Sequence, residues 1–116
     1  MVKPRPHMTL IYTDSRAGRR LDDKSVTYTR EQVVALIRDL RHPDASLITT
    51  LPSGAGLDFL VHDDGTIWIE FYADDGLHSA TVSLATAERV FERAYSLEHM
   101  PETKSRFADL IEEWDY

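Results

Sequence analysis

Residues 66–73 read TIWIEFYA, and this stretch decides the fold because its side chains alternate in character. Successive side chains of an extended strand point to opposite faces of a sheet. One face of this strand would carry Ile67, Ile69 and Phe71. The other face would carry Trp68, Glu70 and Tyr72. The alternation predicts a β-strand with one face in the core and a more polar face opposite.

Three further β-rich segments accompany this strand and predict an antiparallel meander. They are residues 45–51, 57–62 and 77–82. Two turns of the form Asp-Asp-Gly, at 63–65 and 74–76, stand on either side of the central strand. Glycine accepts the positive φ that tight turns need, and aspartate accepts hydrogen bonds from its own turn.

Thr29 and Gln32 predict the start of the clearest helix. They are spaced as a capping box, in which each side chain bonds the backbone N–H of the other residue. Apolar residues then recur at helical spacing, at Val33, Leu36, Ile37 and Leu40. The helix is predicted to end near Arg41, ahead of Pro43.

Two more helices are predicted after the meander. Ser83 would cap the first, which has apolar residues at Ala87, Val90, Phe91, Ala94 and Tyr95. Pro101 and Glu102 would begin the second. The apolar stripe of this second helix would be Phe107, Leu110, Ile111 and Trp114.

The residues before the capped helix are predicted to hold one strand. Residues 8–12 favour a strand, residues 14–25 a loop, and residues 1–7 a flexible segment. The element order predicts an α+β fold in a single domain, residues 1–116. Its mainly antiparallel sheet would have about five strands, with three helices packed largely on one face.

The composition is that of an ordinary globular domain. Of the 116 residues, 42% are hydrophobic and 28% are charged. Cysteine is absent, which excludes disulfides and thiolate chemistry and fits a reducing compartment. No apolar run approaches the roughly 20 residues that span a bilayer, and the first residues lack a secretion signal. We therefore expect a bacterial-type cytoplasmic protein with no membrane partner.

Charge is divided unevenly along the chain. Residues 1–41 hold nine basic and five acidic side chains, a net charge of +4. Residues 42–116 hold four basic and fifteen acidic side chains, a net charge of −11. A fold built mainly from the second part would attract cationic partners and repel phosphate backbones. This asymmetry predicts a cationic protein partner and no nucleic acid.

No motif for catalysis stands beside this charge signal. The five histidines lack metal-ligand spacing, although His62 and His78 could meet across the meander beside Asp63 or Glu70. The Asp-Asp-Gly turns lack the ligand pattern of a calcium loop. Phosphate-binding loops and nucleophile elbows are missing from the sequence. We therefore expect no enzyme activity, no catalytic residue, no metal and no other cofactor.

The strand face opposite the core is the predicted partner-binding surface. It combines two aromatic anchors with carboxylates that select basic partners. The predicted residues are Asp63, Asp64, Trp68, Glu70, Tyr72, Asp74 and Asp75. Two alternatives remain open: Trp68 and Tyr72 could pack beneath residues 16–24, or in a homodimer interface. A monomer and a homodimer are both compatible with the sequence.

The chain resembles the small α+β immunity proteins of bacterial polymorphic-toxin and contact-dependent inhibition systems. The capped helix at 29–40, the strand DGTIWIEF at 64–71 and the strand-to-helix step through Ser83 carry the resemblance. It implies an acidic protein that neutralises one cognate toxin, often a basic nuclease, by occluding its active site. The alternatives are a secretion chaperone or adaptor that binds an amphipathic client segment, and an enzyme with a histidine-centred pocket.

Overall fold

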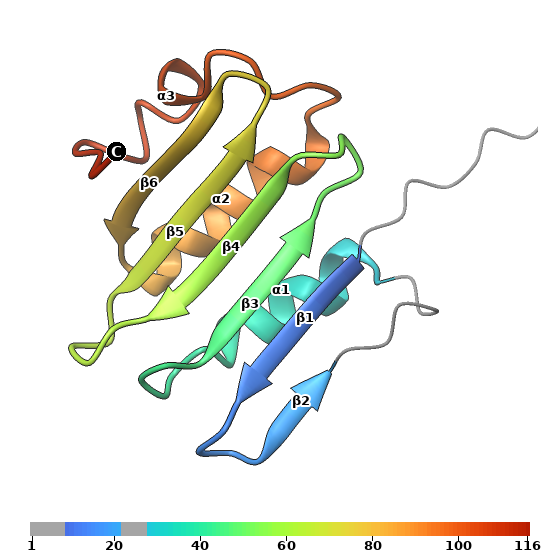
Figure 1. Cartoon of the computed structure of the whole chain (residues 1–116), viewed down its shortest axis with the longest axis vertical. Helices are drawn as coiled ribbons and strands as arrows, with labels where there is room; N and C mark the ends of the chain where they lie inside the picture. The colour runs from blue at the N-terminus through green and yellow to red at the C-terminus, as the bar shows by residue number, and fades with distance from the viewer. Residues whose placement is uncertain (1–8, 22–27) are drawn as a thin grey trace, which may run out of the picture.

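The computed structural model of the chain describes residues 9–21 and 28–116, which form one six-stranded antiparallel sheet with helices on one face (Figure 1). The strands follow the order β2-β1-β3-β4-β5-β6 across the sheet. Their bounds are β1 (Thr9–Asp14), β2 (Arg19–Leu21), β3 (Ser46–Thr50), β4 (Gly56–Val61), β5 (Ile67–Ala73) and β6 (Gly76–Val82). The predicted α+β class is confirmed, with six strands where about five were expected.

Helices α1 (Arg30–Arg38) and α2 (Leu84–Ser96) lie against the same face of the sheet (Figure 1). The short helix α3 (Thr103–Arg106) lies beside the turn that joins β5 to β6. No helix in the described part of the chain is long and apolar enough to cross a bilayer. Among the described residues, no helix covers the opposite face of the sheet.

Strand β5 organises the core as its alternation predicted. Ile67, Ile69 and Phe71 are each 0% exposed and face the helices. They pack in one cluster with Ile37 of α1 and Phe91 of α2. Burying an aromatic or branched side chain contributes about 1.5–3 kcal/mol. A one-residue slip of β5 would bring these three side chains to the open face, so their burial holds the register.

Local signals define both long helices. The Gln32 backbone N–H donates to the Thr29 hydroxyl (3.2 Å), and the Thr29 N–H donates to Gln32 Oε1 (2.8 Å). The predicted capping box is thereby confirmed. Helix α1 ends at Arg38, a little before the predicted end near Arg41. The predicted N-cap Ser83 accepts the backbone N–H of Thr86 at 3.1 Å and starts α2.

The predicted loop over residues 14–25 is wrong in part, because β2 lies within it. β2 pairs with β1 in the register Tyr12↔Leu21. Gly18 adopts a φ of 65° in the connecting turn, and Asp14 Oδ1 accepts the Ala17 N–H at 3.2 Å. Three residues are too few to show an alternating pattern. Residues 22–27 and the predicted flexible segment 1–7 lie outside the described residues.

The predicted long final helix is also wrong, because α3 has only four residues. Glu102 precedes it at a φ of 54°, in the left-handed region, and makes no side-chain cap. Residues of the predicted apolar stripe nevertheless pack against the core: Phe107 is fully buried, and the centre of the Trp114 ring lies 5.7 Å from that of the Phe71 ring. Tertiary packing therefore places these side chains without a regular helix.

The last residues of the chain run along the outer edge of β6. The backbone N–H of Asp115 donates to the Ser79 carbonyl at 2.8 Å, and Tyr116 N–H donates to the same oxygen at 3.3 Å. Thr81 Oγ1 also donates to Asp115 Oδ2 (3.3 Å). Part of an otherwise open sheet edge is covered by these contacts.

Candidate functional site

The open face of the sheet is defined by three rows of side chains that cross the strands in register. The central row runs through Ile11, Ile48, Asp58, Glu70 and Ser79. A second row runs through Thr13, Ser46, Leu60, Trp68 and Thr81. A third row runs through Thr50, Gly56, Tyr72 and Leu77. The structure therefore brings Trp68, Glu70 and Tyr72 together on a face that the described helices leave uncovered (Figure 1).

Apolar groups are unusually accessible on this face. Tyr72 is 50% exposed, Ile48 is 45% exposed and Leu77 is 41% exposed. Trp68 is half-buried between its cross-strand neighbours Leu60 and Thr81. Large exposed apolar side chains gathered on one surface are typical of interaction sites. The face offers contact area that the monomer does not use.

Two carboxyl groups face each other at the centre of this surface. Asp58 on β4 pairs in register with Glu70 on β5. Like charges directly opposite each other destabilise a sheet. Partial burial, and next the charge of Glu70, raise the pKa of Asp58 from its ordinary 3.8 to about 6, while the Thr49 backbone N–H acts in the lowering direction.

A hollow of about 160 Å³ opens over this acid pair. It is lined by Ser46, Ile48, Asp58, Phe59, Leu60, Trp68 and Glu70. At about 30 Å³ per water molecule, its volume corresponds to roughly five waters. Its walls are mainly apolar, whereas two carboxyl groups supply its charge.

A glycine on the neighbouring strand leaves room for Tyr72. Gly56 lies opposite it in register, and a Cβ added at Gly56 would stand 3.1 Å from Tyr72 Cδ2. That distance is tighter than ordinary contact, so a side chain at Gly56 would push the ring aside. The missing side chain at Gly56 leaves room for the Tyr72 side chain on the open face.

The first predicted aspartate pair lies at one end of β5. Asp64 Oδ1 accepts the Thr66 backbone N–H (2.9 Å) and the Thr66 hydroxyl (2.6 Å). These hydrogen bonds lower the pKa of Asp64. Asp63 is exposed in the same turn. Asp64 thus stabilises its turn, and Asp63 is the more available of the two carboxylates.

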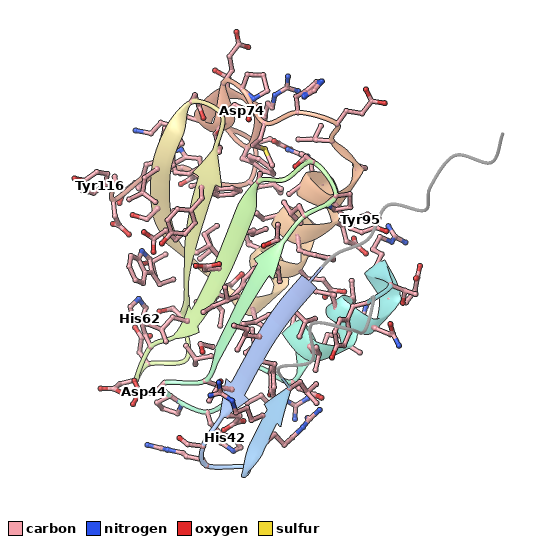
Figure 2. The ribbon with its side chains drawn as sticks, turned by 45° about the vertical axis from the view of Figure 1, so that its right-hand side comes forward. His42, Asp44, His62, Asp74, Tyr95 and Tyr116 are labelled. Carbon is pink, nitrogen blue, oxygen red and sulfur yellow. The ribbon has the colours of Figure 1, made fainter. Side chains whose placement is uncertain are left out.

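The second predicted pair lies at the other end of β5, as the label of Asp74 in Figure 2 shows relative to that of His62. Asp74 Oδ2 accepts the Met100 N–H at 3.0 Å. Asp75 accepts the Thr103 N–H (2.9 Å) and the Thr103 hydroxyl (2.6 Å). Burial would raise the pKa of Asp75, but the bonds from Thr103 and the nearby His78 lower it to about 2.

The four turn aspartates therefore do not form one patch. β5 has seven residues, which at about 3.3 Å each separate its two ends by about 23 Å. Asp74 and Asp75 are hydrogen-bonded to the segment that carries α3. Sequence reasoning did not single out Asp58, although the alternation of residues 57–61 already places it on the same face as Glu70.

The histidines are not brought together either. His62 begins the turn that joins β4 to β5, whereas His78 lies on the helix side of β6, with its ring 6.1 Å from that of Trp114. His42 Nδ1 contacts the buried Asp14 at 2.8 Å and joins the end of β1 to the loop after α1. Within residues 9–21 and 28–116, no three potential ligands gather to hold a metal ion.

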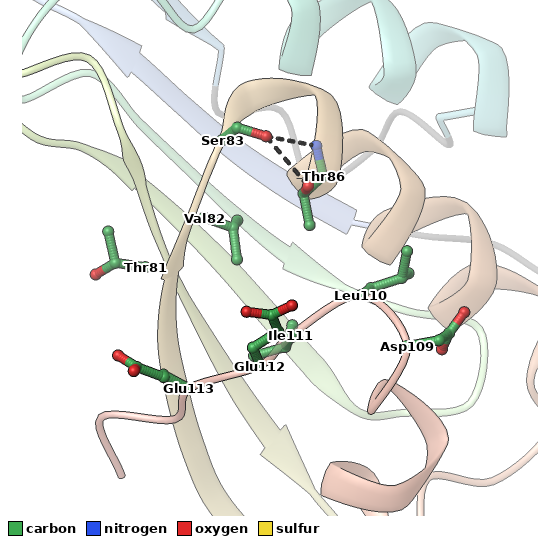
Figure 3. Close-up of a pocket in the computed structure, with 9 residues that line it drawn as sticks. All are labelled: Thr81, Val82, Ser83, Thr86, Asp109, Leu110, Ile111, Glu112 and Glu113. Carbon is green, nitrogen blue, oxygen red and sulfur yellow. Dashed lines mark hydrogen bonds between the residues drawn. The ribbon is translucent and has the colours of Figure 1, made fainter.

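A second hollow of about 350 Å³ lies where α2 begins (Figure 3). Its lining is Thr81, Val82, Ser83, Thr86, Asp109, Leu110, Ile111, Glu112 and Glu113. The Ser83 hydroxyl donates to Thr86 Oγ1, and Asp109 Oδ2 accepts from the Arg93 guanidinium at 2.9 Å. This hollow is polar and acidic, and it is not an apolar groove for a client helix.

Three arginines form salt bridges outside the open face. Arg38 bonds Glu88, and Arg93 bonds Asp109, both among the helical elements. Arg19 reaches Asp39 (3.2 Å), and its guanidinium lies 5.2 Å from the centre of the Tyr12 ring. In the part of the chain that the structure describes, no lysine or arginine forms a salt bridge with Asp58 or Glu70.

Comparison of the chain with known protein families, with curated proteins and with solved structures found no match in any of the three.

Proposed function

We propose that this protein acts by binding: it is an immunity protein that neutralises a cognate toxin with a cationic surface by covering the toxin's active site. The uncovered sheet face carries the proposal, because Trp68 and Tyr72 stand beside the central pair Asp58 and Glu70. Aromatic side chains supply contact energy, and carboxylates select and steer a basic partner. Such a protein works in the cytoplasm, without a cofactor.

Charge supports a cationic protein partner over a second copy of the same chain. A symmetric dimer through this face would bring one Asp58–Glu70 pair close to another. Juxtaposed like charges cost several kcal/mol in an interface. A basic surface, such as that around the active site of a nuclease, offers the complementary charge.

The alternative of a secretion chaperone needs an apolar groove for an amphipathic client. The hollow beside α2 holds Asp109, Glu112 and Glu113 in its lining. Helix-in-groove recognition relies on apolar anchors spaced along one helix face. This hollow therefore gives no support to client binding at α2.

The test is protection from the toxin by the variant that combines Trp68→Ala with Glu70→Gln. The partner is first captured from the source cells, and it must arrest growth when expressed alone. Coexpression of the wild-type protein is expected to restore growth. The double variant should fold and yet lose protection, because it removes one anchor and one carboxylate from the face.

The matched control combines Tyr95→Ala with Glu31→Gln, which removes one aromatic ring and one acid from the helix side. This control is expected to protect as the wild type does. Circular dichroism and urea unfolding check that both variants fold. Full protection by the Trp68 and Glu70 double variant would reject the proposed surface.

A further inference from the structure

The hollow over Asp58 and Glu70 has the form of a receptor for one side chain. Two carboxyl groups belong to its lining, and Ile48, Leu60 and Trp68 form its walls. Apolar walls keep water away from an ion pair and so strengthen its Coulomb attraction. A ligand that fits must be cationic at its tip and apolar or flat along its sides.

We propose that this hollow receives a single arginine side chain of the partner protein, an inference that rests on the proposed function. Asp58 and Glu70 stand on adjacent strands, which are about 4.8 Å apart. A guanidinium presents donors in a planar fork and can bond both carboxylates at once. Its flat face stacks on an indole, which Trp68 provides at the wall.

Lysine fits the same hollow less well. Its ammonium group is a compact, strongly hydrated point charge without a planar face. It would have to give up water in a site where only two carboxyl groups and the Ser46 hydroxyl replace that water. Arginine is more weakly hydrated and uses the aromatic wall.

Occupation of the hollow is coupled to loss of a proton. Partial burial, and next the charge of Glu70, raise the pKa of Asp58 to about 6, so part of Asp58 is protonated near that pH. Glu70 and Tyr72 on β5 are the titratable groups that face Asp58, whereas β3 presents Ser46 and Ile48 there. A bound guanidinium favours the ionised form of Asp58. Arginine should therefore bind about tenfold more weakly at pH 5 than at pH 7.5.

The test uses capped tripeptides and needs no identified partner. The peptides acetyl-Gly-Arg-Gly-amide, its lysine analogue and its neutral citrulline analogue are titrated into isotope-labelled protein at pH 7.5 and pH 5. The indole N–H resonance of Trp68 reports the hollow. Trp114, which packs on the helix side against Phe71, is the internal control.

The arginine peptide is expected to shift the Trp68 resonance and leave Trp114 unchanged. The lysine and citrulline peptides should bind at least tenfold more weakly. Asp58→Asn should weaken the arginine peptide at least tenfold and remove its pH dependence, and Glu31→Gln, which changes an exposed acid of α1 on the helix side, should change nothing. Equal binding of arginine and citrulline, equal binding of arginine and lysine, or an unaffected Asp58→Asn variant would overturn the inference.

These outcomes are separate from the fate of the proposed function. If the peptides do not discriminate but the Trp68 and Glu70 double variant still loses protection, the arginine receptor is wrong and the binding face stands. If that double variant protects fully, the proposed function itself fails.

Discussion

Asp58 and Glu70 lie directly opposite each other on β4 and β5, so one hollow on the sheet contains two carboxyl groups. Partial burial, and next the charge of Glu70, raise the pKa of Asp58 to about 6. A group whose folded pKa lies above its unfolded value of about 3.9 stabilises the fold only while it is protonated. Stability attributable to Asp58 should therefore rise as the pH falls from about 7.5 to 4.

The first prediction is that Asp58→Asn stabilises the protein at pH 7.5. Asparagine removes a partly buried charge and its repulsion with Glu70, and we expect a gain of about 1–2 kcal/mol once solvent screening at this partly exposed site is allowed for. Urea unfolding at pH 7.5 and pH 4.5 measures the gain, which should fall to roughly one third at the lower pH, where Asp58 of the unfolded chain is still largely ionised. Equal gains at both pH values would show that the charge is not the cause.

The second prediction concerns the bond between Asp75 and the α3 segment. Asp75→Asn should lower the free energy of unfolding by about 1 kcal/mol at pH 7, because it weakens the bonds from Thr103. The pKa of Asp75 is lowered to about 2, so this stabilisation exists above about pH 4 and disappears as the pH falls toward 2.

Thr103→Val tests the same contact from the other side. The two effects should be less than additive, because both variants affect the hydrogen bond from the Thr103 hydroxyl to Asp75. Urea unfolding of the two single variants and the double variant gives the coupling. Strict additivity would mean that the two residues act independently.

A third prediction follows from the capping box at α1. Thr29→Ala should destabilise the protein by about 1 kcal/mol, because the first turn loses a hydrogen-bond acceptor. Thr29→Ser keeps the hydroxyl and should retain most of the stability. Thermal unfolding of the two variants compares them directly, and equal losses would assign the effect to the methyl group.

The fourth prediction is that Tyr12→Phe is neutral or stabilises the protein by up to about 1 kcal/mol. Tyr12 is 0% exposed, and its hydroxyl has no hydrogen-bond partner among the described residues. Phenylalanine keeps the ring that Arg19 contacts. Tyr116→Phe, at a site that is 72% exposed, is the control and should change nothing. A marked loss of stability in Tyr12→Phe would reveal a partner for the hydroxyl.

Elements whose sequence patterns lie within a few neighbouring residues could be predicted from the sequence. Thr29 and Gln32 are three residues apart, and their capping contact depends on nothing else in the chain. The alternation in β5 spans seven residues and places its faces correctly. By contrast, β2 has three residues and exists because β1 pairs with it.

The sequence predicted too long a final helix, because tertiary contacts and not helical geometry place its apolar side chains. Phe107 packs against Phe71 (5.0 Å between ring centres), and Asp75 holds the N–H of Thr103. The candidate site shows the same division. Alternation alone puts Trp68, Glu70 and Tyr72 on one face, whereas the Asp58–Glu70 pair requires the register of two strands, which no single segment encodes.

The hydrogen bonds that Asp74 and Asp75 accept affect how mutational mapping of this protein is interpreted. Their carboxylates hold the backbone at Met100 and Thr103, and the chain just beyond packs Phe107 against the reverse side of β5. Substitution of either aspartate by a neutral residue would lower the apparent affinity for a partner even if the partner contacted neither residue. Affinity lost at either position has to be normalised to folding before it is assigned to an interface.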